Sequence, residues 1–190
     1  MKINHQLLEN ECFIPNWKIN FLFLGTFNPD GGEKVRYYYG RKKNQTWPTL
    51  AKIFNDKRLL HESNDFDFFS SLKENGIACM DLIKKVECNE IDRGNILGKG
   101  YSDSRIINNR IKREYLIDEI LEVIKSNKNC VVFSTWGNGS SLRDWVKHVN
   151  LLKQEVDIVN LVSPSLVAKV PKGKNKVEYI ESSWRSKVKL

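Results

Sequence analysis

Four short apolar segments, separated by longer stretches with helical spacing, constrain the fold of this chain more than any other feature. They predict buried strands over Asn20–Phe27, Ile77–Ile83, Cys130–Thr135 and Val156–Val162. Apolar residues at helical spacing predict helices over Trp47–Phe54, Ser104–Ser126, Ser140–Val149 and Val177–Val188. Ser102 or Asp103 is the expected cap of the second of these helices. This alternation, with no repeat or low-complexity linker, predicts a single α/β domain over residues 1–190.

The length of the chain and its polarity narrow the class of protein. A domain of 190 residues buries enough surface to be stable without a disulfide or a metal. No apolar run approaches the ~20 residues that a membrane-spanning helix needs. The first ten residues are too polar for a signal peptide. We therefore expect a cytoplasmic protein that does not act on membranes.

Basic residues outnumber acidic ones by 31 to 23, which gives a net charge of +8. An excess of this size favours a polyanionic partner, and nucleic acid above an acidic membrane if the basic segments share one face. The excess gathers in four segments, which are Arg41–Lys43, Lys84–Lys85, Lys169–Lys176 and Arg185–Lys189.

Neither the cysteines nor the histidines form a recognisable site. The four cysteines contain no C-x-x-C pair, so we expect buried free thiols rather than a metal site or a disulfide. The histidines His5, His61 and His148 lie far apart and outside the candidate loops, so each is expected to be a surface or packing residue rather than a catalytic base.

Polar residues stand at the carboxyl ends of the predicted strands, where open parallel sheets bind their ligands. The first strand runs into the turn Gly25–Pro29, the second ends near Asp81, and the fourth leads into Ser163–Ser165. Between the first two strands, Tyr37–Tyr39 and Asn44–Pro48 supply aromatic faces and amides. This combination suits a flat heterocyclic ligand.

Several separated motifs together resemble the uracil-DNA glycosylase superfamily, nearest its mismatch-specific and hypoxanthine-type branches. Gly25–Pro29 is similar to the first motif, a turn that holds the water-activating residue. Tyr38–Trp47 resembles the following segment, in which an Asn precedes an aromatic residue. Gly76–Asp81 is similar to the central strand, and Ser102–Ser104 to a short element of the hypoxanthine-type branch. Ser163–Ala168 resembles the second motif, the loop that enters the minor groove.

This resemblance covers most of the chain and implies both a fold and a reaction. The implied fold is a three-layer α/β/α sandwich around a mainly parallel four-stranded sheet. The implied activity is that of a monofunctional DNA glycosylase, which flips an aberrant base out of DNA and hydrolyses its N-glycosidic bond to leave an abasic site. The expected enzyme is a monomer, needs no metal or other cofactor, and has DNA as its partner. Uracil, hypoxanthine, mismatched thymine and modified pyrimidines all stay open as substrates, for genome repair or for defence against foreign DNA.

The resemblance also implies roles for individual residues. Asn28 or Asn44 positions the attacking water, and Asp81 orients that water or a partner amide. The expected base-binding residues are Phe27, Tyr39, Trp47 and Ser163. The expected DNA-binding residues are Ser165, Leu166, Val167, Lys169, Lys172 and Lys174. Of these, Leu166 or Val167 would fill the stack that the flipped base leaves.

Two departures from the family pattern bear on these roles. The first motif has Thr26 and Phe27 between Gly25 and Asn28, where the mismatch-specific pattern has a single residue. Either Asn28 is displaced by one position, or Phe27 occupies the catalytic position and Asn44 handles the water instead. The second motif carries Ser163 where the classical uracil enzymes have a histidine, which removes the usual imidazole donor to the leaving base.

Each motif also has a purely structural interpretation. Asn28 lies in a good turn sequence, Asn44 is also suited to cap a loop, and Trp47 to fill the core. Asp81 and Asp103 are also suited to capping. The alternative function is a non-catalytic DNA-binding module that retains the glycosylase fold.

Overall fold

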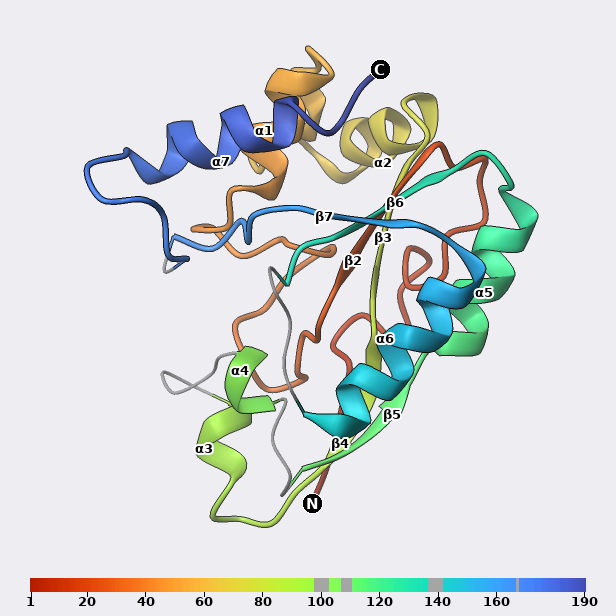
Figure 1. The fold of residues 1–190 in the computed structure, drawn as a ribbon, viewed down its shortest axis with the longest axis vertical. Coiled ribbons are helices and arrows are strands. Elements are labelled where there is room, and N and C mark those ends of the chain that lie inside the picture. Colours follow the sequence, from red (N-terminus) through yellow and green to blue (C-terminus); the bar gives the residue numbers. More distant parts are fainter. Residues whose placement is uncertain (98–102, 107–110, 137–141, 167) are drawn as a thin grey trace.

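A computed structural model describes residues 1–97, 103–106, 111–136, 142–166 and 168–190. Its centre is a four-stranded parallel sheet in the order β3-β2-β6-β7 (Figure 1). The strands are β2 (Phe21–Gly25), β3 (Ile77–Asp81), β6 (Val131–Ser134) and β7 (Ile158–Asn160). Every residue of β3 and all but the first of β2 are buried, as expected for parallel strands that are covered on both faces.

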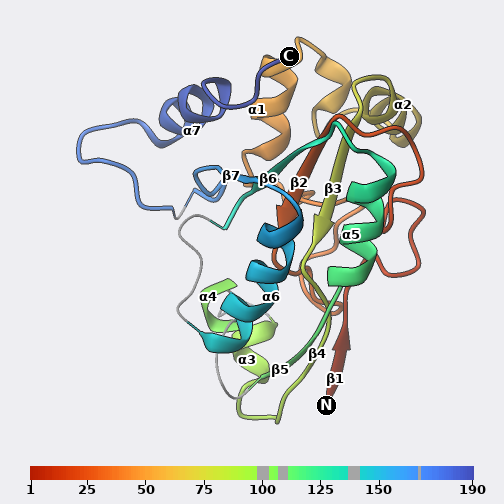
Figure 2. The ribbon, with the colours of Figure 1, turned by 45° about the vertical axis from the view of Figure 1, so that its right-hand side comes forward.

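Helices cover both faces of this sheet (Figures 1 and 2). On one face lie α1 (Thr46–Ile53), α2 (Asp65–Glu74) and α7 (Lys176–Arg185), and on the other lie α5 (Ile117–Ser126) and α6 (Arg143–Glu155). The chain passes from β2 to β3 in one direction along the sheet, and then returns past β2 to β6 and β7 in the opposite direction. Because crossovers between parallel strands are right-handed as a rule, the helices of these two directions lie on opposite faces. The ring of Trp184 in α7 stacks on Phe23, which stacks on Phe133 in the next strand.

A second, antiparallel sheet extends the first one. It consists of β1 (Lys2–Asn4), β4 (Ile83–Glu87) and β5 (Lys112–Tyr115), with β4 in the middle. Only Leu82 separates β3 from β4, and its N–H donates to the Gly25 carbonyl at 3.0 Å. One continuous stretch of chain therefore passes from the parallel sheet into the antiparallel one, and Asp81 stands at the crossing.

Three short helical segments complete the described elements. They are η1 (Lys57–Leu59), α3 (Arg93–Ile96) and α4 (Asp103–Ile106). Among the described residues, no helix is long and apolar enough to span a membrane.

The structure confirms an α/β fold with four parallel strands near the predicted segments. The continuous helix predicted over Ser104–Ser126 is wrong, because the strand β5 separates α4 from α5. Residues 112–115 pair with β4 and show the alternating exposure of a strand. The expected cap Ser102 lies outside the described residues, as does the beginning of the helix predicted over Ser140–Val149, which continues as α6 to Glu155.

Candidate active site at the junction of the two sheets

Asp81 is the centre of a buried polar group at the carboxyl edge of the parallel sheet. It is 3% exposed, and its Oδ2 accepts hydrogen bonds from His5 Nε2 at 2.9 Å and Asn28 Nδ2 at 3.4 Å. A buried carboxylate is stable only where hydrogen bonds replace its hydration. The predicted residues Asp81 and Asn28 are therefore in direct contact, and the unpredicted His5 joins them.

His5 reaches this group because the chain after β1 runs along the Asn28 turn. His5 forms an antiparallel bridge with Pro29, and the next backbone N–H, that of Gln6, donates to the Asn28 carbonyl at 2.7 Å. The expectation that His5 is a packing or surface residue is incomplete, since its ring is packed in the core but also binds Asp81. No local sequence signal marks this, because the contact joins residues 76 positions apart.

Gly25 leaves the space into which the second oxygen of Asp81 projects. A Cβ placed on Gly25 would lie 2.1 Å from Asp81 Oδ1 and 2.8 Å from the Tyr39 hydroxyl. The absence of a side chain at this strand end thus lets a carboxylate and a phenol converge above the backbone. Tyr39 is half-buried, and its hydroxyl also forms a 3.1 Å hydrogen bond with Thr135 Oγ1 at the end of β6.

Tyr39 is held in an uncommon backbone conformation, with a φ of 56°. Such a left-handed conformation is rare for a bulky residue and is found mainly where the surrounding structure imposes it. Here the turn Tyr37–Gly40 closes with a 3.1 Å hydrogen bond, and the phenol is directed toward Thr135. The predicted base-binding residue Tyr39 therefore lies beside Asp81, at the carboxyl ends of β2 and β6.

A second polar group joins the Asn44 segment to the loop after β7. The Gln45 N–H donates to the Pro164 carbonyl at 3.0 Å, which places Asn44 next to the Ser163–Ser165 loop. Asn44 Oδ1 accepts from the N–H of Thr46, the first residue of α1, at 2.9 Å, so this side-chain oxygen is bound by its own loop. Among the described residues, no hydrogen bond connects Asn44 directly to Asn28 or Asp81.

The other predicted base-binding residues are placed differently. Trp47 is 1% exposed, donates its indole N–H to the Tyr38 carbonyl at 2.8 Å and packs edge-on against Phe68. This burial favours the alternative interpretation of Trp47 as a core residue. Phe27 is also buried and contacts the His5 ring edge-on. Ser163 is half-buried, and its Oγ accepts from the Ser165 N–H at 3.4 Å.

The predicted DNA-binding residues lie on the loop between β7 and α7. Lys169, Lys172 and Lys174 are exposed, and Leu166 is half-buried with its carbonyl bound by Lys176 Nζ at 2.7 Å. Val167 lies outside the described residues. The hydrogen bond from Gln45 to Pro164 brings this loop close to the segment that follows Arg41–Lys43. The basic segments Arg41–Lys43 and Lys169–Lys176 therefore belong to two loops that are in contact.

The charge of Asp81 acts on its buried neighbours. Burial, together with the nearby Asp81 carboxylate, raises the pKa of the Tyr38 phenol and of the Cys79 thiol well above their ordinary values. Both groups therefore stay neutral, and Tyr38 donates its hydroxyl to the Phe13 carbonyl at 3.0 Å. All four cysteines are buried and free. The described part of the chain contains no group of three or more His, Cys, Asp or Glu side chains that could hold a metal ion.

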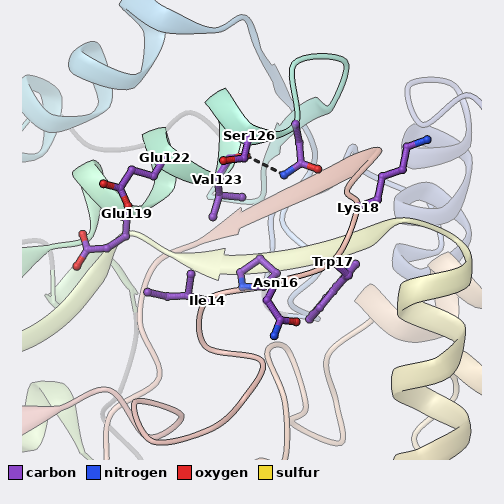
Figure 3. A pocket seen from close by; sticks show the side chains of 10 residues that line it. Ile14, Asn16, Trp17, Lys18, Glu119, Glu122, Val123 and Ser126 are labelled. Atoms are coloured by element: carbon purple, nitrogen blue, oxygen red, sulfur yellow. Dashed lines mark hydrogen bonds between the residues drawn. The ribbon is translucent and has the colours of Figure 1, made fainter.

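A surface hollow lies elsewhere in the described part of the chain. It measures about 490 Å³ and is bounded by the segment Ile14–Lys18 on one side and by α5 on the other (Figure 3). Trp17 at its edge donates its indole N–H to the carbonyl of Ile77, the first residue of β3. Because ligands of open α/β sheets bind at the carboxyl ends of the strands, we place the candidate site at Asp81 rather than in this hollow.

Comparisons with protein-family models, with characterised proteins and with solved structures give no match to this chain.

Proposed function

We propose that the protein is a DNA glycosylase that hydrolyses the N-glycosidic bond of an aberrant base. The observation that supports this most is the gathering of distant motifs at one edge of the sheet. Asn28 contacts Asp81 across 53 positions of sequence, and the Asn44 segment contacts the Ser163 loop. Core packing requires none of these polar pairings, whereas hydrolysis of a nucleotide requires polar groups on both sides of the bond that breaks. The motif resemblance and the net charge of +8 favour the same function.

The two polar groups have different chemistry, and we assign them different roles. Asp81 and Asn28 supply acceptor oxygens in a buried setting, which suits holding a water against the sugar. Asn44 has its oxygen bound to the Thr46 N–H, so its NH₂ is the end that can donate to the departing base or to a phosphate. Tyr39, which lies beside Asp81, is the aromatic face on which the extruded base would stack. The finer fold assignment, a three-layer sandwich of the glycosylase type, belongs to the same proposal.

The test is a base-release assay on labelled duplexes and single strands that contain uracil, hypoxanthine, mismatched thymine or modified cytosines, followed by alkaline cleavage. We expect the wild-type protein to release at least one of these bases. Asn28→Ala and Asn44→Ala should each slow release by about a hundredfold, the usual cost of losing one transition-state hydrogen bond, while DNA binding is kept.

A matched control is Asn150→Ala, an exposed position on α6 away from both polar groups, which should leave the rate unchanged. DNA binding without release of any base, by a folded wild-type protein, would replace the enzyme with the non-catalytic binding module. Neither binding nor release would overturn the nucleic-acid function itself.

A further inference from the structure

His5 is a buried polar side chain that the predicted site did not include. It is 1% exposed and lies among three aromatic rings, those of Phe13, Phe27 and Tyr38, at centroid distances of 5.2, 5.7 and 5.4 Å. These three rings offer no hydrogen bond to the His5 imidazole, so its two buried nitrogens need partners from other groups. Both do so at the junction of the two sheets.

The two hydrogen bonds of His5 fix its tautomer. Nδ1 accepts the Leu7 backbone N–H at 3.1 Å, and a ring nitrogen that accepts a hydrogen bond cannot carry a proton itself. The single proton of the ring therefore lies on Nε2, which donates it to Asp81 Oδ2 at 2.9 Å. Backbone geometry in the segment after β1 thus determines how the carboxylate is bound.

The two oxygens of Asp81 consequently have different surroundings. Oδ2 accepts from two neutral donors, His5 Nε2 and Asn28 Nδ2, and is fully engaged inside the protein. Oδ1 projects above Gly25, on the side where the Tyr39 hydroxyl also lies. The carboxylate is thereby held in one rotational orientation by groups that add no positive charge.

We infer that His5 is a positioning residue, which holds Asp81 so that Oδ1 accepts a hydrogen bond from the water that attacks the sugar. This inference rests on the proposed function and deepens it. As the water oxygen bonds to the anomeric carbon, a water proton passes to Asp81 Oδ1. The electron pair of the N-glycosidic bond leaves with the base, and Asp81 later returns the proton to solvent. His5 keeps its own proton throughout.

The experiment compares His5→Leu with His5→Gln in single-turnover base release by the full-length protein. The leucine removes the donor to Asp81, so we expect the rate at saturating enzyme to fall by about tenfold to a hundredfold, as when other supporting hydrogen bonds to a reactive group are lost. The concentration for half-maximal rate should stay unchanged, because the substrate does not touch His5. The Gln amide can donate in place of Nε2 and should restore the rate to within about fivefold of wild type, by the same reasoning.

The matched control is His61→Leu, which removes a partly buried histidine that pairs with Tyr37 away from Asp81. It should leave the rate constant unchanged. Equal rates for wild type and His5→Leu would overturn the inference while leaving the glycosylase activity established. A wild-type protein that releases no base would instead overturn the proposed function, and the water-binding role of Asp81 with it.

A second measurement needs no substitution and no activity. In wild-type protein with ¹⁵N-labelled histidine, the His5 ring should show an unprotonated Nδ1 and a protonated Nε2 at neutral pH. A proton on Nδ1, alone or together with Nε2, would overturn the inference whatever the enzyme assay shows.

Discussion

Two carboxylates in this molecule are each bound by several donors, yet their surroundings differ. Asp56, the cap of η1, binds the Arg58 guanidinium through both oxygens, and also accepts from Ser71 Oγ at 2.7 Å and Asn75 Nδ2 at 3.2 Å. Among the residues that the structure describes, Asp81 receives hydrogen bonds from neutral donors only, and these reach only its Oδ2. The donors around Asp56 bind both of its oxygens, whereas those around Asp81 leave Oδ1 available beside Gly25 and the Tyr39 hydroxyl.

The comparison separates a structural charge from a functional one. The hydrogen bonds from Arg58 hold the pKa of Asp56 well below its usual range, so this carboxylate is a permanent anion that ties η1 to α2. A carboxylate that is neutralised by a guanidinium is a poor proton acceptor. Asp81 is held in place without that neutralisation, which suits a group that must take up a proton during a reaction.

The largest expected effect is that of Asp81→Asn on base release. The Asn oxygen can still accept from His5 and Asn28, so the fold should be kept and the melting temperature should change little. The group above Gly25 would become an NH₂, which cannot accept a water proton, and the rate should fall by about a hundredfold or more. Single-turnover kinetics measure the rate of base release, and a parallel thermal melt measures the melting temperature. A rate near that of wild type would mean that Asp81 is as structural as Asp56.

Gly25→Ala tests the geometry of the same oxygen with a smaller change. The new methyl group would lie 2.1 Å from Asp81 Oδ1, so the carboxylate must turn away, and we expect base release to slow by about tenfold to a hundredfold, by analogy with other losses of supporting geometry. Gly94→Ala is the matched control, since a Cβ there has nothing within 4 Å. If both variants kept the wild-type rate, the orientation of Oδ1 would not matter to the reaction.

Asp56→Asn should show the opposite behaviour, with unchanged rate per folded molecule and lower stability. Loss of charge-assisted hydrogen bonds to a largely buried carboxylate should cost about 1–3 kcal/mol at pH 7 in a denaturant titration. The pKa of Asp56 is lower in the folded state than in the unfolded chain, so its contribution is complete at neutral pH and is lost as the pH falls below about 5. The difference between the two proteins should therefore shrink on acidification. A constant difference from pH 7 to pH 3 would contradict this assignment.

The smallest effect concerns the basic loop. Lys172→Ala removes one exposed charge beside the Ser163 loop and should weaken DNA binding by less than about tenfold, for all sequences alike. The slope of log affinity against log salt concentration should fall by about one unit, because one phosphate contact is lost. Lys128→Ala, an exposed position just before β6 at the opposite edge of the sheet, is the matched control. Equal slopes for the two variants would remove this loop from the DNA-binding face.

Much of the fold follows from sequence because its signals are local. The buried runs that form β2, β3 and β6 are continuous apolar segments, and polar residues at their ends indicate which edge of the sheet carries chemistry. Asp81 and Asn28 were therefore predictable as members of the site. The direct contact between Asn28 and Asp81 was not predictable, because it depends on the conformation of the turn that follows β2.

The failures come from interactions between distant segments. The apolar residues around β5 fit helical spacing, but pairing with β4 outweighs that local preference. Lys112, Arg113 and Glu114 are three consecutive charged residues, so no alternation of apolar and polar residues in the sequence marked this strand. The burial of Trp47 could not be read from the motif, because a position in a motif does not indicate how far a side chain is exposed. His5 had no signal at all, since only the meeting of the two sheets brings it to Asp81.

The passage of one chain segment from β3 directly into β4 has a consequence for folding. Asp81 belongs to the parallel sheet, whereas His5 follows β1, which pairs with β4 in the antiparallel sheet. Contacts between residues so far apart in sequence close late, because the entropy of the intervening loop must be overcome first. Refolding protein should therefore regain its helical signal before the hydrogen bond between His5 and Asp81 forms, so the candidate site should be the last part of the fold to assemble.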